Sequence, residues 1–337
     1  MNFIFDDALS EEVVEQEFRQ RVQTGDLSMV KSFRDKADDI YENAPLRKRG
    51  AAFSSLYRKF IWTLGYPERV SEIFEEVDKE ARLPSVCILT RVMRRDEEGA
   101  QLSEDGMQLG IQIRSDSLLD VERCRYLLRH ELTHILDILD PAFGYDTTRP
   151  LSEVSPSEES LFRDRYRTLW DLSVDGRLES KWHLPQGLKE QRAGEFKSLF
   201  SNLGTEAADR VIEILWGGYR LSSGELRQMV TGAVSLCAIL NIAADISDEV
   251  ELHRTYGPGS SCPLCQFPTH EWAETGDELS QVINEEYPDW EPKQGICSQC
   301  ANRYLFTAAF STNSSGTPNQ IIARTSNSFS GSSMEDI

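Results

Sequence analysis

Two histidines placed four residues apart, His130 and His134, constrain this chain more than any other feature. In a helix, side chains at positions i and i+4 lie on the same face, so both imidazoles can reach one metal ion. Glu131 lies about 100° further round the same helix. At that position a carboxylate can accept a proton from a water molecule without acting as a ligand itself. The run therefore predicts a helix that presents two nitrogen ligands and an adjacent general base.

The residues around this run predict a buried helix. Apolar side chains recur at helical spacing on the face away from the histidines, namely Val121, Cys124, Leu128, Leu132, Ile135 and Leu139. Asp120 is a suitable N-cap residue. Pro141 disfavours helix in the residue before it, which places the end of the helix at Asp140. Together these signals predict one largely apolar helix with a single functional edge.

The His-Glu-Leu-Thr-His run, the strand-like segments before it and the helix expected after it resemble the zincin metallopeptidases. The resemblance implies a zinc-dependent peptidase in which His130 and His134 bind zinc and Glu131 is the general base. Catalytic zinc usually has three protein ligands and one position left for water. In the gluzincin branch the third ligand is a glutamate in a Glu-x-x-x-Asp pattern on a later helix. The aspartate of that pattern holds a ligand histidine in place.

This chain instead has Asp171-x-x-x-Asp175, inside a segment with strong helical periodicity. The two carboxylates lie about 40° apart on one helix face. By resemblance, we assign Asp171 as the third zinc ligand and Asp175 as the residue that holds a ligand histidine. An aspartate in place of glutamate departs from the gluzincin pattern, so other candidates for the third ligand stay open: Glu179, His183 and Asp245.

A second metal site is predicted by two Cys-x-x-Cys pairs, formed by Cys262, Cys265, Cys297 and Cys300. Two such pairs are typical of a zinc ion held by four thiolates in a zinc ribbon. We therefore expect two Zn²⁺ ions per chain, one catalytic and one structural. The stretch between the pairs is acidic, which favours protein contact or bracing of the fold over nucleic-acid binding. The other three cysteines are expected to be buried apolar residues.

The chain as a whole predicts an α+β fold that is mostly helical. We expect an N-terminal helical region at 1–80, followed at 81–255 by a zincin-like core, a small sheet plus the active-site helix. A zinc ribbon is expected at 256–306 and a disordered tail at 307–337, where small polar residues dominate.

Within the expected core, segments 85–93 and 108–114 read as strands separated by a polar turn. The second strand either has a free edge that binds an extended peptide, as the resemblance implies, or is an internal strand. Further along, residues 226–246 predict one long apolar helix. We expect this helix to pack in the core and to take no part in chemistry.

The formal net charge of −20 disfavours binding to nucleic acid or to anionic membranes. Apolar runs in the chain are far shorter than the roughly 20 residues that cross a bilayer. The first residues lack the basic and apolar segments of a secretion signal. Cysteines grouped for metal binding are typical of a reducing compartment. We therefore expect a cytoplasmic protein.

Three functions are consistent with these features. The first is a zinc peptidase that acts on a peptide or protein substrate. The second is a non-proteolytic zincin-like scaffold that recruits a protein partner through the ribbon. The third is the SprT-like class, which joins the same motif to a zinc ribbon and acts on DNA-bound proteins. That class has a nearby downstream histidine as third ligand, whereas this chain has none between His134 and His183. The third function therefore ranks last.

Overall fold

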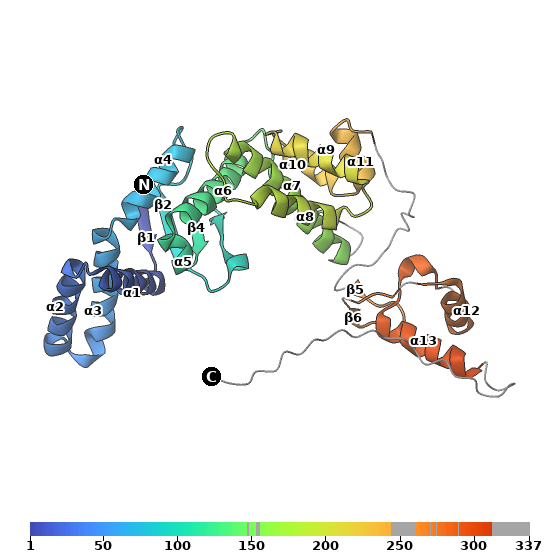
Figure 1. Ribbon diagram of the computed structural model, residues 1–337, viewed down its shortest axis with the longest axis horizontal. Coiled ribbons are helices and arrows are strands. Elements are labelled where there is room, and N and C mark those ends of the chain that lie inside the picture. The colour runs from blue at the N-terminus through green and yellow to red at the C-terminus, as the bar shows by residue number, and fades with distance from the viewer. Residues whose placement is uncertain are drawn as a thin grey trace. The chain divides into compact units, whose positions relative to one another are not determined.

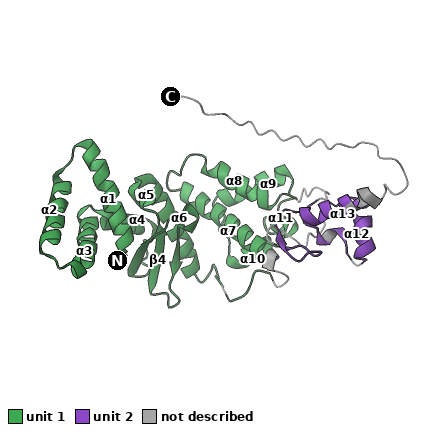
Figure 2. Ribbon diagram, turned by 90° about the horizontal axis from the view of Figure 1, so that it is seen from below, with its two compact units in different colours: residues 1–155, 159–250 green, residues 156–158, 251–337 purple. Residues whose placement is uncertain are grey.

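The computed structural model describes residues 1–146, 148–152, 156–243, 260–269, 271–273, 275–288 and 290–311. The chain divides into two compact units, shown in different colours in Figure 2. The first comprises residues 1–155 and 159–250, and the second comprises 156–158 and 251–337. Asp245, the boundary expected near residue 256 and the tail from residue 312 onward lie outside the described residues.

The first unit begins with a strand and four helices, and a small sheet precedes the histidine helix (Figure 1). The elements in chain order are β1 (Asn2–Phe5), α1 (Asp7–Thr24), α2 (Ser28–Asn43), α3 (Leu46–Thr63), α4 (Tyr66–Val77), β2 (Val86–Arg91), the 3₁₀ turn η1 (Arg95–Glu97), β3 (Gly99–Leu102), β4 (Gln108–Ile113), α5 (Ser115–Leu119) and α6 (Val121–Leu139). The expected fold class, α+β and mostly helical, is confirmed at this level.

The sheet has the strand order β1-β2-β4-β3. Strands β1, β2 and β4 are parallel, and β3 pairs antiparallel with β4. Strand β4, expected at 108–114, is therefore an internal strand, and β3 forms the edge of the sheet next to it. The sequence reading placed β3 in a polar turn. Its four residues include a glycine and a glutamine and show too little apolar alternation to signal a strand.

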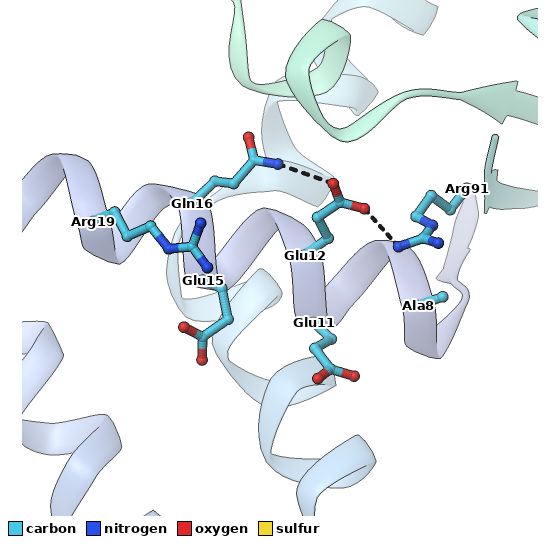
Figure 3. Close-up of a pocket in the computed structure, with 7 residues that line it drawn as sticks. All are labelled: Ala8, Glu11, Glu12, Glu15, Gln16, Arg19 and Arg91. Atoms are coloured by element: carbon cyan, nitrogen blue, oxygen red, sulfur yellow. Dashed lines mark hydrogen bonds and ion pairs between the residues drawn. The ribbon is translucent and has the colours of Figure 1, made fainter. Parts of the chain in front are cut away.

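The N-terminal helices pack through aromatic side chains. The rings of Phe18, Phe33 and Phe60, one from each of α1, α2 and α3, meet edge to face at centroid distances of 5.1–5.8 Å. Beside α1 lies a hollow lined mainly by charged residues (Figure 3). Within it, Arg91 at the end of β2 forms a 2.7 Å ion pair with Glu12. This pair joins the end of the sheet to the helical layer.

Helix α6 forms where the sequence predicts it. The Asp120 side chain caps it by accepting the backbone N–H groups of Glu122 and Arg123, and the helix ends before Asp140. Cys124, Leu128 and Leu132 are fully buried in the core shared with the sheet. The apolar face thus anchors α6 on the first core and leaves the histidine edge directed away from it.

The second half of the unit is a helical bundle with its own apolar core. Its helices are α7 (Pro156–Glu179), α8 (Leu188–Leu199), α9 (Thr205–Trp216), α10 (Ser223–Met229) and α11 (Ala233–Ile239). The expectation of one long helix over 226–246 is wrong, because α10 and α11 are separated at Gly232. This residue has an extended backbone, with φ of 160°. Glycine destabilises a helix interior, which permits the break.

The second unit is small. It contains β5 (Ser260–Ser261), β6 (Pro268–Thr269), α12 (Asp277–Glu286), the 3₁₀ turn η2 (Pro292–Gln294) and α13 (Ser298–Ser311). Helix α13 includes residues 307–311, which the sequence reading assigned to the tail. Among the described residues of both units, every helix is either too short or too polar to cross a bilayer.

One glycine permits the close contact between α7 and α9. A Cβ atom on Gly176 would overlap the backbone carbonyl of Trp216 at the end of α9. Gly176 follows Asp175 directly in the chain, so the close approach of α9 fixes this part of α7. A backbone obstacle cannot rotate away as a flexible side chain can.

We therefore expect Gly176→Ala to lower the free energy of unfolding by about 1–3 kcal/mol, as other overpacked cores do. Gly194→Ala is the matched control, because Gly194 lies in helix α8 and an added Cβ there meets open space. The control should be neutral or stabilising by up to about 1 kcal/mol. Urea denaturation of both variants measures the difference, and equal stabilities would contradict the packing argument.

Candidate metal centre

Three donor atoms from two helices converge at one point. On α6, Nε2 of His130 and Nε2 of His134 lie 3.1 Å apart. On α7, Oδ1 of Asp171 lies 3.0 Å from the His134 nitrogen and 3.4 Å from the His130 nitrogen. Ligands about 2.1 Å from a tetrahedral zinc ion are separated by about 3.4 Å. The spacing and the donor types therefore fit one metal ion, and these residues can hold one.

Asp175 fixes the orientation of His130. Its Oδ1 atom lies 2.7 Å from Nδ1 of His130, and the carboxylate is fully buried. An ionised carboxylate only accepts hydrogen bonds, so Nδ1 carries the proton and Nε2 faces the metal position. The hydroxyl of Tyr126 also donates to Asp175, at 3.2 Å. Tyr126 precedes His130 by four residues, a same-face spacing that the sequence reading did not use.

His134 is held by packing as well as by its 3.0 Å contact with Asp171. Its ring meets the ring of Trp170 edge to face, with centroids 4.3 Å apart. Trp170 in turn donates its Nε1–H to Asp137 at 2.9 Å. Asp137 also forms a two-pronged ion pair with Arg177. Nδ1 of His134 is buried and has no hydrogen-bond partner within the described part of the chain. The orientation of this imidazole therefore depends on the tryptophan, which adjoins Asp171 in sequence.

Arg192, on helix α8, joins the two aspartates. Its Nη1 atom lies 2.9 Å from Oδ2 of Asp171, and its Nε atom lies 2.8 Å from Oδ2 of Asp175. The sequence reading missed this residue. Arg192 lies 17 positions after Asp175 on a separate helix, and nothing in its local pattern distinguishes it from a surface arginine.

The buried charges shift the ionisation of the histidine. Burial alone would lower the pKa of His130, but the negative charges of Asp175 and Asp171 outweigh it and raise that pKa to about 10. The pKa of Asp171 is correspondingly held well below its usual value, because its bonds to the two imidazoles outweigh its burial. In the metal-free protein, the group therefore binds a proton where the metal would sit.

Glu131 lies on the same helix but outside the set of three donors. Its Oε2 atom accepts the backbone N–H of Ala100, in strand β3, at 3.0 Å. The start of β3 is itself fixed by Glu98, whose buried carboxylate accepts the backbone N–H of Arg114 and pairs with Arg123 at 2.8 Å. The carboxylate of Glu131 thus lies between the histidine helix and the edge strand.

The other candidates for the third ligand do not join the two histidines. Glu179 is exposed and accepts the indole N–H of Trp216. His183 is exposed, beyond the end of α7. Asp245 lies outside the described residues. Of the described candidates, Asp171 alone has an oxygen beside both imidazoles. Its metal role, like that of Asp175, stays a prediction, but the geometry is what that prediction requires.

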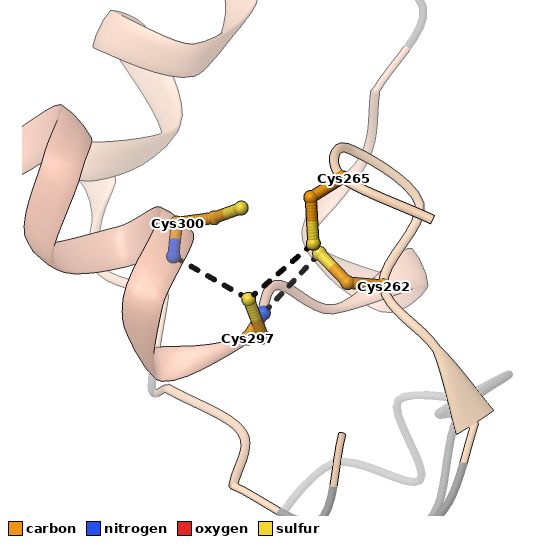
Figure 4. A group of neighbouring side chains, drawn as sticks. All are labelled: Cys262, Cys265, Cys297 and Cys300. Atoms are coloured by element: carbon orange, nitrogen blue, oxygen red, sulfur yellow. Dashed lines mark hydrogen bonds between the residues drawn. The ribbon is translucent and has the colours of Figure 1, made fainter. Parts of the chain in front are cut away.

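The four cysteines of the second unit also converge (Figure 4). Their sulfur atoms lie within 4.8 Å of one another, and Sγ of Cys265 is 3.9 Å from Sγ of Cys297. Tetrahedral zinc with thiolate ligands about 2.3 Å away separates its sulfurs by about 3.8 Å. The cluster can therefore hold a metal ion. The remaining cysteines, Cys87, Cys124 and Cys237, are buried in the first unit, as expected.

The local backbone favours the thiolate form of Cys262, whereas burial raises the pKa of Cys297 and that of Cys300. Burial would raise the pKa of Cys262, but backbone N–H groups of Cys297, Cys265 and Leu264 bond its sulfur and lower that pKa to about 7. Thiolate is the form that binds zinc. The sequence reading found this cluster from spacing alone, since each pair lies in a short knuckle.

The chain has no match among protein-family models, curated proteins or solved structures. The resemblance to zincins therefore stays a prediction from the sequence.

The histidine pKa leads to a pH prediction. His130 is expected to stay protonated up to a pH of about 10 when its site is free of metal. Its raised pKa stabilises the folded metal-free protein fully below pH about 6.5, and this contribution is lost as the pH rises through 10. NMR titration of the imidazole resonances checks this. Asp175→Asn, which removes the main cause, should lower the pKa of His130 toward 6.5. A pKa of His130 near 6.5 in the metal-free protein without substitutions would contradict the contacts described for His130.

Removing the thiolates should unfold the second unit alone. The apolar core around the cysteines is small, so the free energy of metal binding there is largely free energy of folding. We expect Cys297→Ser to open residues 260–311 to limited proteolysis while the first unit stays resistant. Cys124→Ala is the matched control, because it removes a buried cysteine from the first unit. Protease resistance of the second unit in Cys297→Ser would show that its fold needs no metal.

Proposed function

We propose that this protein is a zinc-dependent peptidase. The observation that supports it best is the convergence of His130, His134 and Asp171 on one point, with Glu131 beside them on the same helix. Three protein ligands are typical of catalytic zinc, whereas structural zinc has four. When bound, zinc would supply Lewis-acid chemistry, acidifying water and polarising a substrate carbonyl.

The chain's own residues then carry the proton transfers. The N–H of Ala100 holds Oε2 of Glu131 and leaves the other carboxylate oxygen for the incoming proton. Glu131 accepts that proton as water attacks the peptide carbonyl and passes it to the departing amine. Asp175 keeps the proton of His130 on Nδ1, so that the opposite nitrogen remains a ligand.

The free main-chain groups at the edge of strand β3 favour a peptide as the substrate. The N–H of Ala100 points away from β4 toward Glu131. Hydrogen-bonding direction alternates along an antiparallel strand, so the main-chain groups of Leu102 also point away from the sheet. An extended peptide can add to such an edge through main-chain hydrogen bonds. In this proposal the substrate lies along β3, with its scissile carbonyl near Glu131.

A second candidate function is a non-proteolytic scaffold that recruits a protein partner through the cysteine cluster. Exposed apolar side chains on the second unit favour it, since Phe267 is 73% exposed and Leu305 is 49% exposed. Aromatic side chains are enriched at protein interfaces. Two bound zinc ions without hydrolysis of any member of a peptide library would favour this candidate over the first.

The peptidase proposal is tested by Glu131→Gln. Glutamine has nearly the same shape as glutamate, so zinc content should stay at the native level. Because glutamine cannot accept the proton, peptide hydrolysis should fall at least about 100-fold. The measurement is turnover of a fluorogenic peptide library by the native protein and the variant, each with its zinc content determined.

Glu122→Gln is the matched control for that experiment. Glu122 lies in the first turn of the same helix and is exposed. Its replacement should leave both zinc content and turnover unchanged. Native turnover in Glu131→Gln would refute the mechanism.

A further inference from the structure

The two oxygens of Asp171 have different partners. Oδ1 faces the two imidazoles, at 3.0 Å and 3.4 Å. Oδ2 lies 2.9 Å from Nη1 of Arg192, whose side chain is only 14% exposed. A carboxylate can bind a metal through one oxygen or through both. Here Oδ2 of Asp171 is already paired with the buried guanidinium of Arg192.

We propose that Arg192 is a positioning residue that keeps Asp171 a one-oxygen ligand and so preserves an open coordination position at the metal. This inference depends on the proposed metal centre. It adds that Arg192 sets how many oxygen atoms of Asp171 bind the metal. Were Oδ2 free to turn toward the metal, it would join the two imidazole nitrogens, Oδ1 and the water as a fifth donor atom, and it would fill the position that a substrate carbonyl needs.

The shape of arginine suits this role. Its planar guanidinium presents several N–H donors in a fixed fork. One donor bonds Asp171, while Nε bonds Asp175 at 2.8 Å. Because Asp175 holds His130, a single side chain restrains both a ligand and the partner of a second ligand. The ammonium group of lysine is a point donor and cannot bond both carboxylates in the same geometry.

A second arginine provides an internal comparison. Nε of Arg167 lies 3.9 Å from Oδ2 of Asp171, beyond hydrogen-bond distance, and its side chain is 71% exposed. It carries the same charge toward the same oxygen without holding it. If hydrogen bonding restrains the carboxylate, Arg192 and Arg167 will differ sharply in effect. If charge alone matters, they will differ much less.

The test replaces zinc in the histidine site with Co²⁺ and records the visible spectrum. Four-coordinate cobalt absorbs more strongly than five-coordinate cobalt, so the spectrum reports the ligand number. Each protein is compared with the same protein carrying His134→Ala, and the difference removes any cobalt signal from the cysteine cluster. We expect Arg192→Met to shift the difference spectrum from the four-coordinate to the weaker five-coordinate form. Turnover should fall about 10–100-fold, a size typical of residues that support metal ligands.

Two further variants keep the test decisive. Arg167→Met should retain the native spectrum and native turnover. Arg192→Lys keeps the charge and one donor, so its spectrum and turnover should lie between those of the native protein and Arg192→Met. A native spectrum with native turnover in Arg192→Lys would overturn the proposal even if Arg192→Met does not fold. So would a native spectrum in a folded Arg192→Met.

These outcomes separate the inference from the peptidase proposal. A native protein that binds cobalt in four-coordinate form but hydrolyses no peptide refutes the peptidase, and the spectra still decide the role of Arg192. A native protein that hydrolyses peptides, with Arg192→Met unchanged in spectrum, refutes only the inference.

Discussion

The contact between helices α6 and α7 is the constraint on which the candidate centre depends. Several polar pairs cross it, among them the following three. His130 meets Asp175, His134 meets Asp171, and Asp137 meets Arg177. Breaking a buried ion pair costs about 3–5 kcal/mol when one partner is left uncompensated. Each pair therefore restrains the helices and sets the position of a donor atom.

The charges around the histidine site are compatible with a dication there. The two buried aspartates face Arg192 and, without metal, a protonated His130. That arrangement is neutral in formal charge. A divalent ion displaces the imidazole proton and leaves one excess positive charge, which the adjacent carboxylate of Glu131 offsets. Since isolated buried charge is costly, the glutamate would help to make a metal-bound state stable without a further anionic ligand.

The sequence was sufficient to identify those residues of the candidate site that lie one helical turn apart on the same helix. Spacing of three to four residues identified His130, His134 and the pair Asp171 and Asp175, because helical geometry is fixed over one turn. Asp171 was placed first by resemblance, and Glu179 stayed open, since both lie on faces of α7 that only the packing of α6 distinguishes. Arg192 comes from another helix, where tertiary contact alone decides its partners. Strand β3 is too short to show periodicity.

The two clusters of donor atoms differ in a way that bears on their roles. The cysteine cluster offers four sulfurs, a complete tetrahedral set, and backbone N–H groups bond its thiols. Such a site leaves no position for a substrate. The histidine centre offers three donors within the described residues, and the carboxylate of Glu131, on the same helix, is held by a strand edge instead. An incomplete set with a carboxylate on the same helix suits the proposed catalysis, whereas the complete set suits bracing of the fold. We infer that a metal in the cysteine cluster would brace the fold, whereas a metal at the histidine centre would take part in catalysis.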